Sequence, residues 1–197
     1  MGMNDRNLNQ SVKKSSAIDG YRNEVFEGRS VTKPAANRWH NLIATNIAIA
    51  VGTRLSGNKA EIYVNGMQVQ LKSDMICYPD VVIVSGAPTF TDQNSDVLRN
   101  PTIVIEIVSN STSPIDKAQR LESYLAIASV KECFLVKADE MRVEQYARQN
   151  AKQWLYRIYD ERDDVISLDA VNCKVSLGEI YAHINVKQAE LSSKAVN

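Results

Sequence analysis

The stretch TIVIEIVS, Thr102 to Ser109, places a single glutamate, Glu106, among five β-branched apolar residues. A continuous apolar run of this kind is typical of a strand that is buried on both faces. An isolated ionised carboxylate is costly to bury, so it must be protonated, paired with a cation or bound to a metal ion. The sequence therefore predicts a buried strand with a partner for Glu106 close by.

A second acidic residue opens the preceding apolar run. In YPDVVIVSG, residues 78–86, Asp80 stands immediately before a predicted strand, Val81–Val84. If the two strands are neighbours, Asp80 and Glu106 can lie at the same end of the sheet. Two carboxylates, completed by waters and substrate oxygens, are a typical ligand set for Mg²⁺. A turn residue at Asp80 and an ion-paired residue at Glu106 would give the same pattern without a metal.

Basic residues follow Glu106 on the next predicted helix, SPIDKAQRLESYLAIA. Ser113 is expected to cap this helix and Pro114 to occupy its first position. Lys117 and Arg120 are three residues apart and therefore lie on one face. Either can supply a cation to Glu106. A buried salt bridge between Glu106 and Lys117, with no metal, is one alternative to a metal site.

The remaining sequence predicts a mixed sheet with flanking helices. Asn37 is expected to cap a helix whose apolar residues recur at helical spacing over residues 38–55. The run Glu61–Leu71 predicts a β-hairpin that turns at Asn65-Gly66. The segment Gly86–Asn100 is rich in turn-forming residues, and we expect a loop that covers the acids as a lid, because it joins their two strands. Further strands are predicted within residues 24–31, 132–148, 154–160 and 164–169, and a short helix or turn within 175–184.

The composition limits the class of protein. The 197 residues are 44% hydrophobic and 23% charged, which is typical of one globular domain. We expect this domain at residues 19–185, between flexible tails at 1–18 and 186–197. The three cysteines have no CxxC spacing, so neither a zinc site nor a disulfide framework is expected. No stretch reaches the roughly 18 apolar residues of a membrane span, and no signal peptide is recognisable, so a cytoplasmic protein without a membrane partner is predicted.

Charge is balanced overall, with 23 basic and 23 acidic side chains, but it is unevenly distributed. Residues 1–60 hold 9 basic and 4 acidic side chains, a weak indication that this third of the chain meets an anion. Lys33, Arg38 and His40 lie there and are candidates for contact with nucleic-acid phosphate. For His40, which adjoins the apolar face of its helix, a half-buried hydrogen-bonded histidine is the simpler interpretation.

Three segments together resemble a known family. YPDVVIVSG, PTIVIEIVSNST and SPIDKAQRLESYLAIASVKECFLVKADEMRVEQY look like the Uma-type branch of the PD-(D/E)XK nuclease superfamily, whose members are labelled restriction endonucleases. The resemblance extends to EVFEG and RWHNLIATNIA and spans roughly residues 21–184. It implies a restriction-endonuclease-like core of α/β (α+β) class, in which a mixed central β-sheet is flanked by helices and the acids lie at its open centre.

The resemblance also implies a set of site residues. By motif match, Asp80 and Glu106 would bind the metal, Glu24 would be an additional acid, and the main-chain carbonyl of Ile107 would be a further ligand. The implied cofactor is Mg²⁺ or Mn²⁺, with no organic cofactor. The implied activity is endonucleolytic hydrolysis of DNA, and a homodimer would supply two active sites for cutting both strands.

The chain departs from the family pattern at the catalytic lysine. The superfamily lysine sits two residues after the second acid, where this chain has Val108. In the Uma-type branch the cation comes from the following helix, and its position falls on Arg120, with Lys117 at the preceding basic position. Arginine is always charged, whereas lysine can change protonation. The alternative function is therefore a catalytically impaired module that binds nucleic acid or a protein partner without cleavage. Tyr124 also matches a family position, but it is expected in the core.

Overall fold

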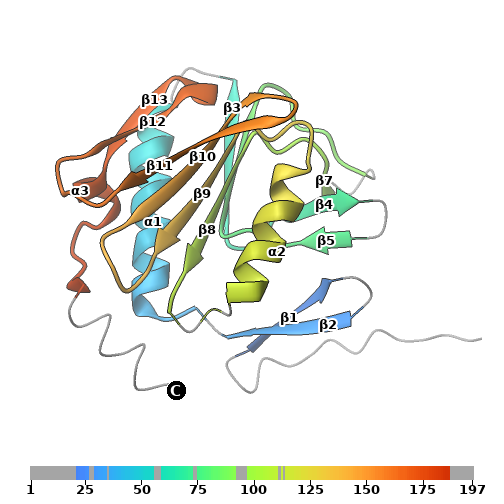
Figure 1. The fold of residues 1–197 in the computed structure, drawn as a ribbon, viewed down its shortest axis with the longest axis horizontal. Coiled ribbons are helices and arrows are strands. Elements are labelled where there is room, and N and C mark those ends of the chain that lie inside the picture. The colour runs from blue at the N-terminus through green and yellow to red at the C-terminus, as the bar shows by residue number, and fades with distance from the viewer. Residues whose placement is uncertain are drawn as a thin grey trace, which may run out of the picture.

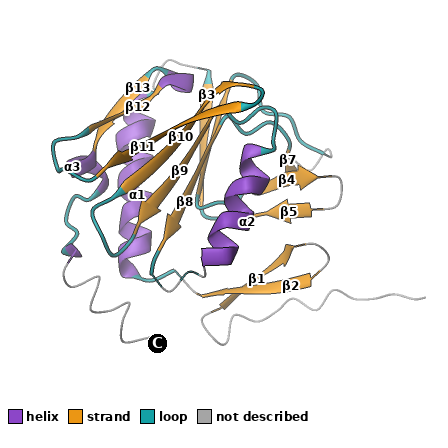
Figure 2. Cartoon of the chain, in the orientation of Figure 1, coloured by secondary structure: helices purple, strands orange, loops and turns teal. Residues whose placement is uncertain are grey.

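The computed structural model describes residues 21–26, 29–34, 36–55, 59–72, 75–91, 97–110, 112 and 114–186, with the backbone alone for residues 21–34, 72 and 115 within these ranges. These residues form a six-stranded sheet with a long helix on each face and three smaller sheets around it (Figures 1 and 2). The predicted fold class, a mixed central sheet flanked by helices, is therefore confirmed. None of the described helices is long and apolar enough to cross a membrane.

The elements have the following bounds. The helices are α1 (Arg38–Arg54), α2 (Pro114–Leu125), α3 (Leu177–Ile180) and the 3₁₀ turn η1 (Asp169–Val171). The main sheet has the order β11-β10-β9-β8-β6-β3, from β3 (Ala60–Val64), β6 (Val81–Ser85), β8 (Ile103–Val108), β9 (Glu132–Lys137), β10 (Val143–Asn150) and β11 (Gln153–Tyr159). The smaller sheets are β1 (Tyr21–Phe26) with β2 (Arg29–Pro34), β12 (Val165–Leu168) with β13 (Cys173–Ser176), and β4 (Gln68–Lys72) between β5 (Met75–Cys77) and β7 (Val97–Leu98).

The centre of the main sheet is the strand that carries Glu106. Every residue of β8 is buried, as the apolar run predicts. β8 pairs antiparallel with β6 and parallel with β9. A parallel pair needs a crossover connection, and α2 supplies it between β8 and β9.

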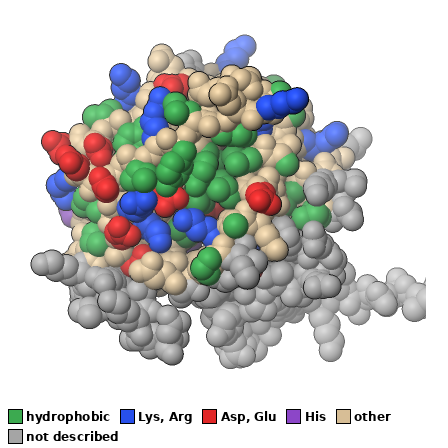
Figure 3. Space-filling view, viewed as in Figure 1, with side chains coloured by type: hydrophobic (Ala, Val, Ile, Leu, Met, Phe, Trp, Pro, Cys, Tyr) green, Lys and Arg blue, Asp and Glu red, His purple; other side chains and the backbone are tan. Residues whose placement is uncertain are grey.

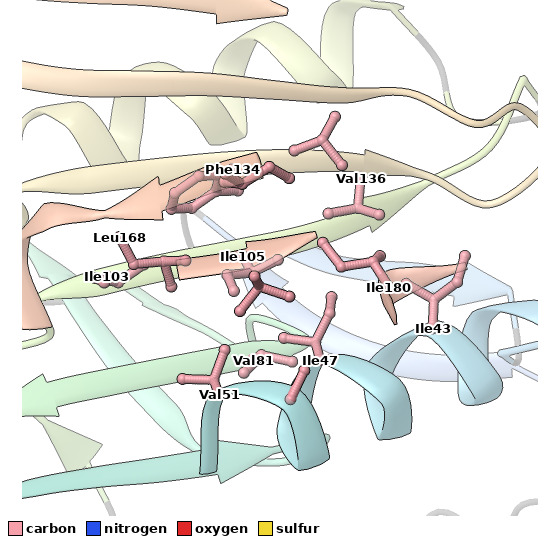
Figure 4. Packing of buried hydrophobic residues seen from close by; sticks show 14 of the residues in the cluster. Ile43, Ile47, Val51, Val81, Ile103, Ile105, Phe134, Val136, Leu168 and Ile180 are labelled. Carbon is pink, nitrogen blue, oxygen red and sulfur yellow. The ribbon is translucent and has the colours of Figure 1, made fainter. Parts of the chain in front are cut away.

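The larger apolar core lies between α1 and the sheet (Figure 4). As predicted, the Asn37 side chain caps α1 by accepting a hydrogen bond from the main-chain N–H of His40 at 2.9 Å. Ile43, Ile47 and Val51 then project from one face of the helix toward alternate residues of β6 and β8. The hairpin β12–β13 and α3 complete this side. The packing leaves an apolar cavity of about 20 Å³. This is too small to hold more than about one water.

A second core lies on the opposite face, beneath α2. Tyr124 of α2 is fully buried there against residues that alternate with those of the first core, among them Val82 of β6 and Val104 of β8. Glu106 has the same parity along β8 as Val104, so its side chain is directed to the α2 face.

A polar network is buried on the α1 side of the sheet. Glu132, 2% exposed, accepts hydrogen bonds from the main-chain N–H groups of Asp169 and Ala170, both at 3.2 Å. The Gln145 side chain donates to Glu132 at 2.9 Å and accepts from the Tyr159 hydroxyl at 2.9 Å. This network joins β9, β10, β11 and η1.

The hairpin predicted within Glu61–Leu71 is wrong in its pairing. The chain does turn there, with φ of 54° at Asn65 and 156° at Gly66. However, β3 pairs with β6 in the main sheet, whereas β4 pairs with β5 and β7. The Asn65 N–H donates to the carbonyl of Asp80 at 2.8 Å, so the turn is held by the start of β6. The buried strand β6 is a stronger partner for β3 than the half-exposed β4.

Other elements differ in detail from the prediction. Within the segment 24–31, predicted as a short strand with a glycine turn, the described residues belong to two paired strands, β1 and β2. β13 was not predicted, and β7 lies inside the predicted loop Gly86–Asn100. Ser113, residues 1–20 and residues 187–197 lie outside the described residues, so the expected cap and the expected tails remain predictions.

Candidate functional site

The register between β6 and β8 brings Asp80 and Glu106 to facing positions. The last regular pair is Val81 with Ile105, so one step further places Asp80 opposite Glu106. The Asp80 side chain turns toward β8 there, and its Oδ2 accepts a hydrogen bond from the Ile107 N–H at 2.8 Å. Both acids are buried, with 4% exposure for Asp80 and 3% for Glu106.

The second oxygen of Asp80 is held by α1. His40 Nε2 lies 2.9 Å from Asp80 Oδ1, and the His40 side chain is only 16% exposed. The Asn37 cap positions His40 in the first turn of the helix, and the burial of Trp39 beside it anchors that turn. Asp80 is thus fixed from two sides.

The main chain of Ile107 faces the same space as Asp80. Regular pairing with β6 ends at Val81, so beyond this point β6 offers β8 no main-chain partner. The N–H and C=O of one strand residue point to the same side of the strand. Because the Ile107 N–H meets Asp80 Oδ2, the Ile107 carbonyl is directed to the same side.

Glu106 is held by side chains of α2. The Tyr124 hydroxyl donates a hydrogen bond to Glu106 Oε1, and Arg120 Nη1 lies 3.8 Å from the same oxygen. Burial, followed by the proximity of Cys77 and Glu106, raises the pKa of Tyr124 well above its ordinary value. Tyr124 therefore stays protonated and acts as a permanent donor. Tyr124 is a core residue, as expected, but its hydroxyl also orients an acid.

Lys117 has a different acidic partner from the one anticipated. Its Nζ lies 3.4 Å from Glu144 Oε2, and Arg142 Nε lies 3.3 Å from Glu144 Oε1. Glu106 forms a salt bridge with Arg120 and Lys117 forms one with Glu144, so these two pairs replace the alternative of a Glu106–Lys117 pair. Lys117 lies on the side of α2 toward β10, where Glu144 is its acidic partner.

The remaining predicted site residues are only partly placed. Glu24 lies in β1 and Lys33 in β2, and their side chains are outside the described part of the structure. The exposed Arg38 guanidinium lies over the ring of Trp39, 4.7 Å from its centroid. Arg38 thus remains beside His40 at the start of α1, while the His40 ring is turned inward to Asp80.

The predicted lid is at the wrong end of the sheet. β6 and β8 are antiparallel, Asp80 precedes β6, and Glu106 lies near the end of β8. The segment Gly86–Asn100 joins the end of β6 to the start of β8. Its two described parts, residues 86–91 and 97–100, therefore adjoin the end of the sheet that is remote from the acids.

The donor set suits a hard cation but is incomplete within the described residues. Asp80, Glu106 and the Ile107 carbonyl offer only oxygen ligands, which is the preference of Mg²⁺ and Mn²⁺. In the part of the chain that is described, no group of three His, Cys, Asp or Glu side chains is arranged to hold a metal. Two carboxylates, one carbonyl and waters are nevertheless a normal Mg²⁺ environment, so the residues present fit the ion.

Comparison with known proteins identifies the family of this chain. The family model described as "Uma2: Putative restriction endonuclease" matches residues 15–178. The chain belongs to the Uma2 family. The predicted resemblance is therefore confirmed, and with it membership of a restriction-endonuclease-like nuclease family. The match covers every predicted site residue.

Two curated relatives of this Uma2 chain come from Synechocystis sp. (strain ATCC 27184 / PCC 6803 / Kazusa). The uncharacterized protein sll1609 is 28% identical over 135 residues, 68% of this chain and 76% of that protein. The uncharacterized protein slr1290 is 19% identical over 161 residues, 81% of this chain and 83% of that protein. The crystal structure of a putative nuclease belonging to DUF820 from Anabaena variabilis ATCC 29413 superimposes with a TM-score of 0.67 at 18% identity, over 81% of this chain and 89% of that one. This similarity supports the Uma2 fold.

The sequence did not predict the contact between His40 and Asp80 or the salt bridge between Lys117 and Glu144. Helical spacing gave one usable signal, because Tyr124 follows Arg120 by four residues and so lies on the same face. No local signal links His40 to Asp80, which are 40 residues apart.

Proposed function

We propose that this Uma2 chain is a metal-dependent endonuclease that hydrolyses DNA phosphodiester bonds. One observation carries the proposal: two buried carboxylates, Asp80 and Glu106, occupy facing positions at one end of the sheet, with the Arg120 guanidinium 3.8 Å from Glu106. Three charged groups concentrated in a buried site are costly for stability. Such a concentration of charged groups is typical of a functional site.

Asp80, Glu106 and the Ile107 carbonyl are the groups that would hold Mg²⁺ or Mn²⁺, with Glu24 as a further acid from β1. When bound, the ion would lower the pKa of water and neutralise charge that develops on the phosphate. The protein supplies a fixed ligand geometry, because Asp80 is held by the Ile107 N–H and by His40. The Tyr124 hydroxyl does the same for Glu106.

Arg120 is the cation in position to stabilise a scissile phosphate. Its guanidinium remains charged and offers paired donors that match phosphate oxygens. It cannot deprotonate water, so in this proposal its role is electrostatic. Lys117, one turn earlier on α2 and 26% exposed, is available to phosphate at the rim, where it competes with its contact to Glu144.

DNA would approach from the side of α1 and the β1–β2 hairpin. Arg38 at the start of α1 is exposed, and Lys33 lies in β2. Both would contact phosphates outside the scissile bond, which contributes affinity without sequence readout. His40 would act as a positioning residue for Asp80, in addition to any contact with DNA. A homodimer would bring two such sites to the two strands.

The test is nicking of supercoiled plasmid in the presence of Mn²⁺, followed by gel electrophoresis. Asp80→Asn removes a charge but keeps an oxygen that can accept from the Ile107 N–H. We expect it to lower the nicking rate at least about 100-fold, since a metal contributes several kcal/mol to the transition state. The matched control is Asp116→Asn, an exposed acid in the first turn of α2, which should nick at the wild-type rate. Nicking that survives Asp80→Asn would contradict the proposal.

A second function is favoured by the Glu106–Arg120 ion pair. If this pair neutralises Glu106 permanently, the chain binds DNA or a protein partner without cutting. Addition of Mn²⁺ would then leave the melting temperature unchanged, and plasmid would be retarded in a gel but not nicked. In the nuclease proposal, Mn²⁺ raises the melting temperature of the wild type and not that of Asp80→Asn, because a ligand that binds only the folded state stabilises it.

A further inference from the structure

Strand β11 is an edge of the main sheet with an unusually apolar sequence. It lies at one end of the strand order, and no described strand pairs with its outer side. Leu155, Tyr156 and Ile158 are 37%, 46% and 42% exposed. Sheet edges in natural proteins are normally protected by short strands, prolines, bulges or charged residues. β11 has seven residues, QWLYRIY, with no proline, no glycine and a single charge.

That single charge does not protect the outer edge. Arg157 Nη1 contacts Gln145 Oε1 at 3.4 Å, so the side chain is turned toward the face of the sheet that holds the buried Glu132 network. The strand is rich in aromatic and β-branched residues, which favour further strand pairing. The outer hydrogen-bonding groups of β11 are therefore suited to another strand.

Trp154, Tyr156 and Ile158 alternate along β11 and project from the α2 face. Tyr156 stands opposite Tyr146 of β10, with ring centroids 5.0 Å apart. Arg148 lies over the Trp154 ring, 4.2 Å from its centroid. Figure 3 shows hydrophobic side chains gathered in the middle of this face, with basic and acidic side chains at the border. The apolar surface thus continues from α2 across the sheet to its edge.

We propose that β11 pairs antiparallel with β11 of a second copy of this chain, about a two-fold axis at Tyr156. In this register the two Tyr156 side chains meet on the axis, and Trp154 faces Ile158 of the other copy. Lys152 and Asp160 flank the strand. Lys152 of each copy faces Asp160 of the other, so the dimer contains this pair twice. Apolar and opposite-charge pairs at facing positions both stabilise a sheet, so this strand is complementary to itself.

Charge selects this register over its neighbours. A two-fold axis perpendicular to the sheet keeps side chains of one parity on one face, so the axis falls on a residue of the strand. An axis at Arg157 would set two arginines against each other and Lys152 against Arg162. An axis at Leu155 would place Lys152 opposite Ile158 and leave Asp160 without a basic partner. Of these three registers, only the one centred on Tyr156 places Lys152 and Asp160 opposite each other.

The dimer would extend the main sheet across both copies. It would provide the second active site that the proposed nuclease needs, but it depends on the edge strand and not on metal chemistry. Mass and cross-linking report on the dimer without any cleavage, so this inference and the proposed function can fail separately.

The first measurement is the molar mass of the full chain by light scattering as a function of protein concentration. We expect a monomer–dimer equilibrium. Tyr156→Asp should raise the dissociation constant at least about tenfold, because it sets two carboxylates against each other on the axis. Ile49→Asp is the control, since Ile49 is 59% exposed on α1 and away from β11. A monomer at every concentration would overturn the inference, and so would an undiminished dimer of Tyr156→Asp. Circular dichroism establishes that each variant is folded.

The second measurement is site-specific and does not depend on weakening the dimer. Residues on the axis have Cα atoms about 4.5–5.5 Å apart, which is within disulfide range, so Tyr156→Cys should cross-link on mild oxidation. In Ile158→Cys the two thiols would be four residues apart along the paired strands, about 13 Å, and should not cross-link. The native Cys77, Cys133 and Cys173 are buried and do not compete. Equal cross-linking of the two variants would show that the register is wrong.

Discussion

Two buried glutamates on neighbouring parallel strands differ in the groups that hold them, although both are almost inaccessible to solvent. Glu106 on β8 faces α2, near the end of its strand, and it is held by two side chains of that helix. Glu132 opens β9 on the other face, and its partners are two main-chain N–H groups of η1 and the amide of Gln145. The difference lies in the donors and not in the burial.

Main-chain donors cannot move away without unfolding the segment that carries them. Glu132 therefore has a structural role, as the acceptor that holds η1 against the sheet. Of the two donors of Glu106, Tyr124 is buried in the core, whereas Arg120 carries a positive charge that attracts phosphate as well as carboxylate. We therefore expect the contact between Glu106 and Arg120 to open when a ligand binds, and the contacts of Glu132 to remain.

The largest expected effect is the loss of stability in Glu132→Ala. This variant leaves two N–H groups and an amide without their acceptor, and each buried unsatisfied group costs about 1–3 kcal/mol. We expect the free energy of unfolding to fall by about 3–5 kcal/mol, measured by urea denaturation. The nicking rate of the remaining folded protein should not change. A loss of activity without a loss of stability would reverse the roles that we assign to the two glutamates.

The same residue gives a pH dependence of known sign. Burial raises the pKa of Glu132 above its ordinary 4.5, although the N–H groups of Ala170 and Asp169 oppose this. A carboxyl with a raised pKa in the folded state contributes stability below its unfolded pKa, and this is lost as pH rises through the folded pKa. The unfolding free energy of the wild type minus that of Glu132→Gln should therefore decrease as the pH rises above 4.5. An increase over this range would contradict it.

Next in size is the loss of activity in Glu106→Gln. The substitution keeps the shape of the side chain and removes the charge proposed to bind Mn²⁺ or Mg²⁺. We expect the plasmid nicking rate to fall at least about 100-fold and the Mn²⁺-dependent rise in melting temperature to disappear. Glu132→Gln is the matched control, since it removes the other buried glutamate charge and should keep both responses. Retention of the Mn²⁺ response in Glu106→Gln would exclude Glu106 as a ligand.

Tyr124→Phe tests the neutral donor of Glu106. The ring remains in its buried position and only the hydrogen bond is lost, which costs about 1.5–3 kcal/mol for a bond to a charged group. Thermal denaturation should show this loss. Tyr146→Phe is the control: its hydroxyl lies 3.4 Å from Glu144 in a more exposed position, so its loss should cost under about 1 kcal/mol. Equal costs in the two variants would mean that Glu106 gains little from Tyr124.

The smallest effect is expected for Arg120→Lys, which introduces the residue type that the family resemblance implies at this position. A lysine keeps the charge near Glu106, so the nicking rate should change by less than about threefold, or about 0.7 kcal/mol. Arg120→Ala removes the charge and should lower the rate at least about tenfold. If Arg120→Lys activates an otherwise inactive protein, the chain is an impaired nuclease, and the non-cleaving function is the correct one.

The parts of the site that follow from local sequence could be predicted, and the parts that depend on distant pairing could not. The apolar run around Glu106 identified β8, and a second apolar run after Asp80 identified its neighbour. The local sequence does not show that β6 runs antiparallel to β8. For this reason the segment Gly86–Asn100 was expected beside the acids. Helical spacing places Tyr124 on the same face of α2 as Arg120, but the contact of the Tyr124 hydroxyl with Glu106 was not predicted.

Glu132 illustrates what remained hidden. An acid at the first position of a strand is ordinary for a sheet edge, and its partners at Gln145, Asp169 and Ala170 lie 13 to 38 residues away. The pairing of β3 with β6 was missed for the same reason, because the Asn65-Gly66 turn predicts a local hairpin and only the assembled sheet offers a better partner. The ion pair between Lys117 and Glu144 also depends on the position of β10.

Asp80 takes, with a side-chain oxygen, the hydrogen bond from the Ile107 N–H that a longer β6 would have taken with its main chain. The strand therefore ends where the acid begins, and Asp80 contributes to both the sheet and the site. A relative without nuclease activity should therefore show substitutions first at Arg120 and Glu106, which contact each other through their side chains. An aspartate at this strand end should persist. An aspartate at this position in a diverged relative is thus poor evidence of surviving catalysis.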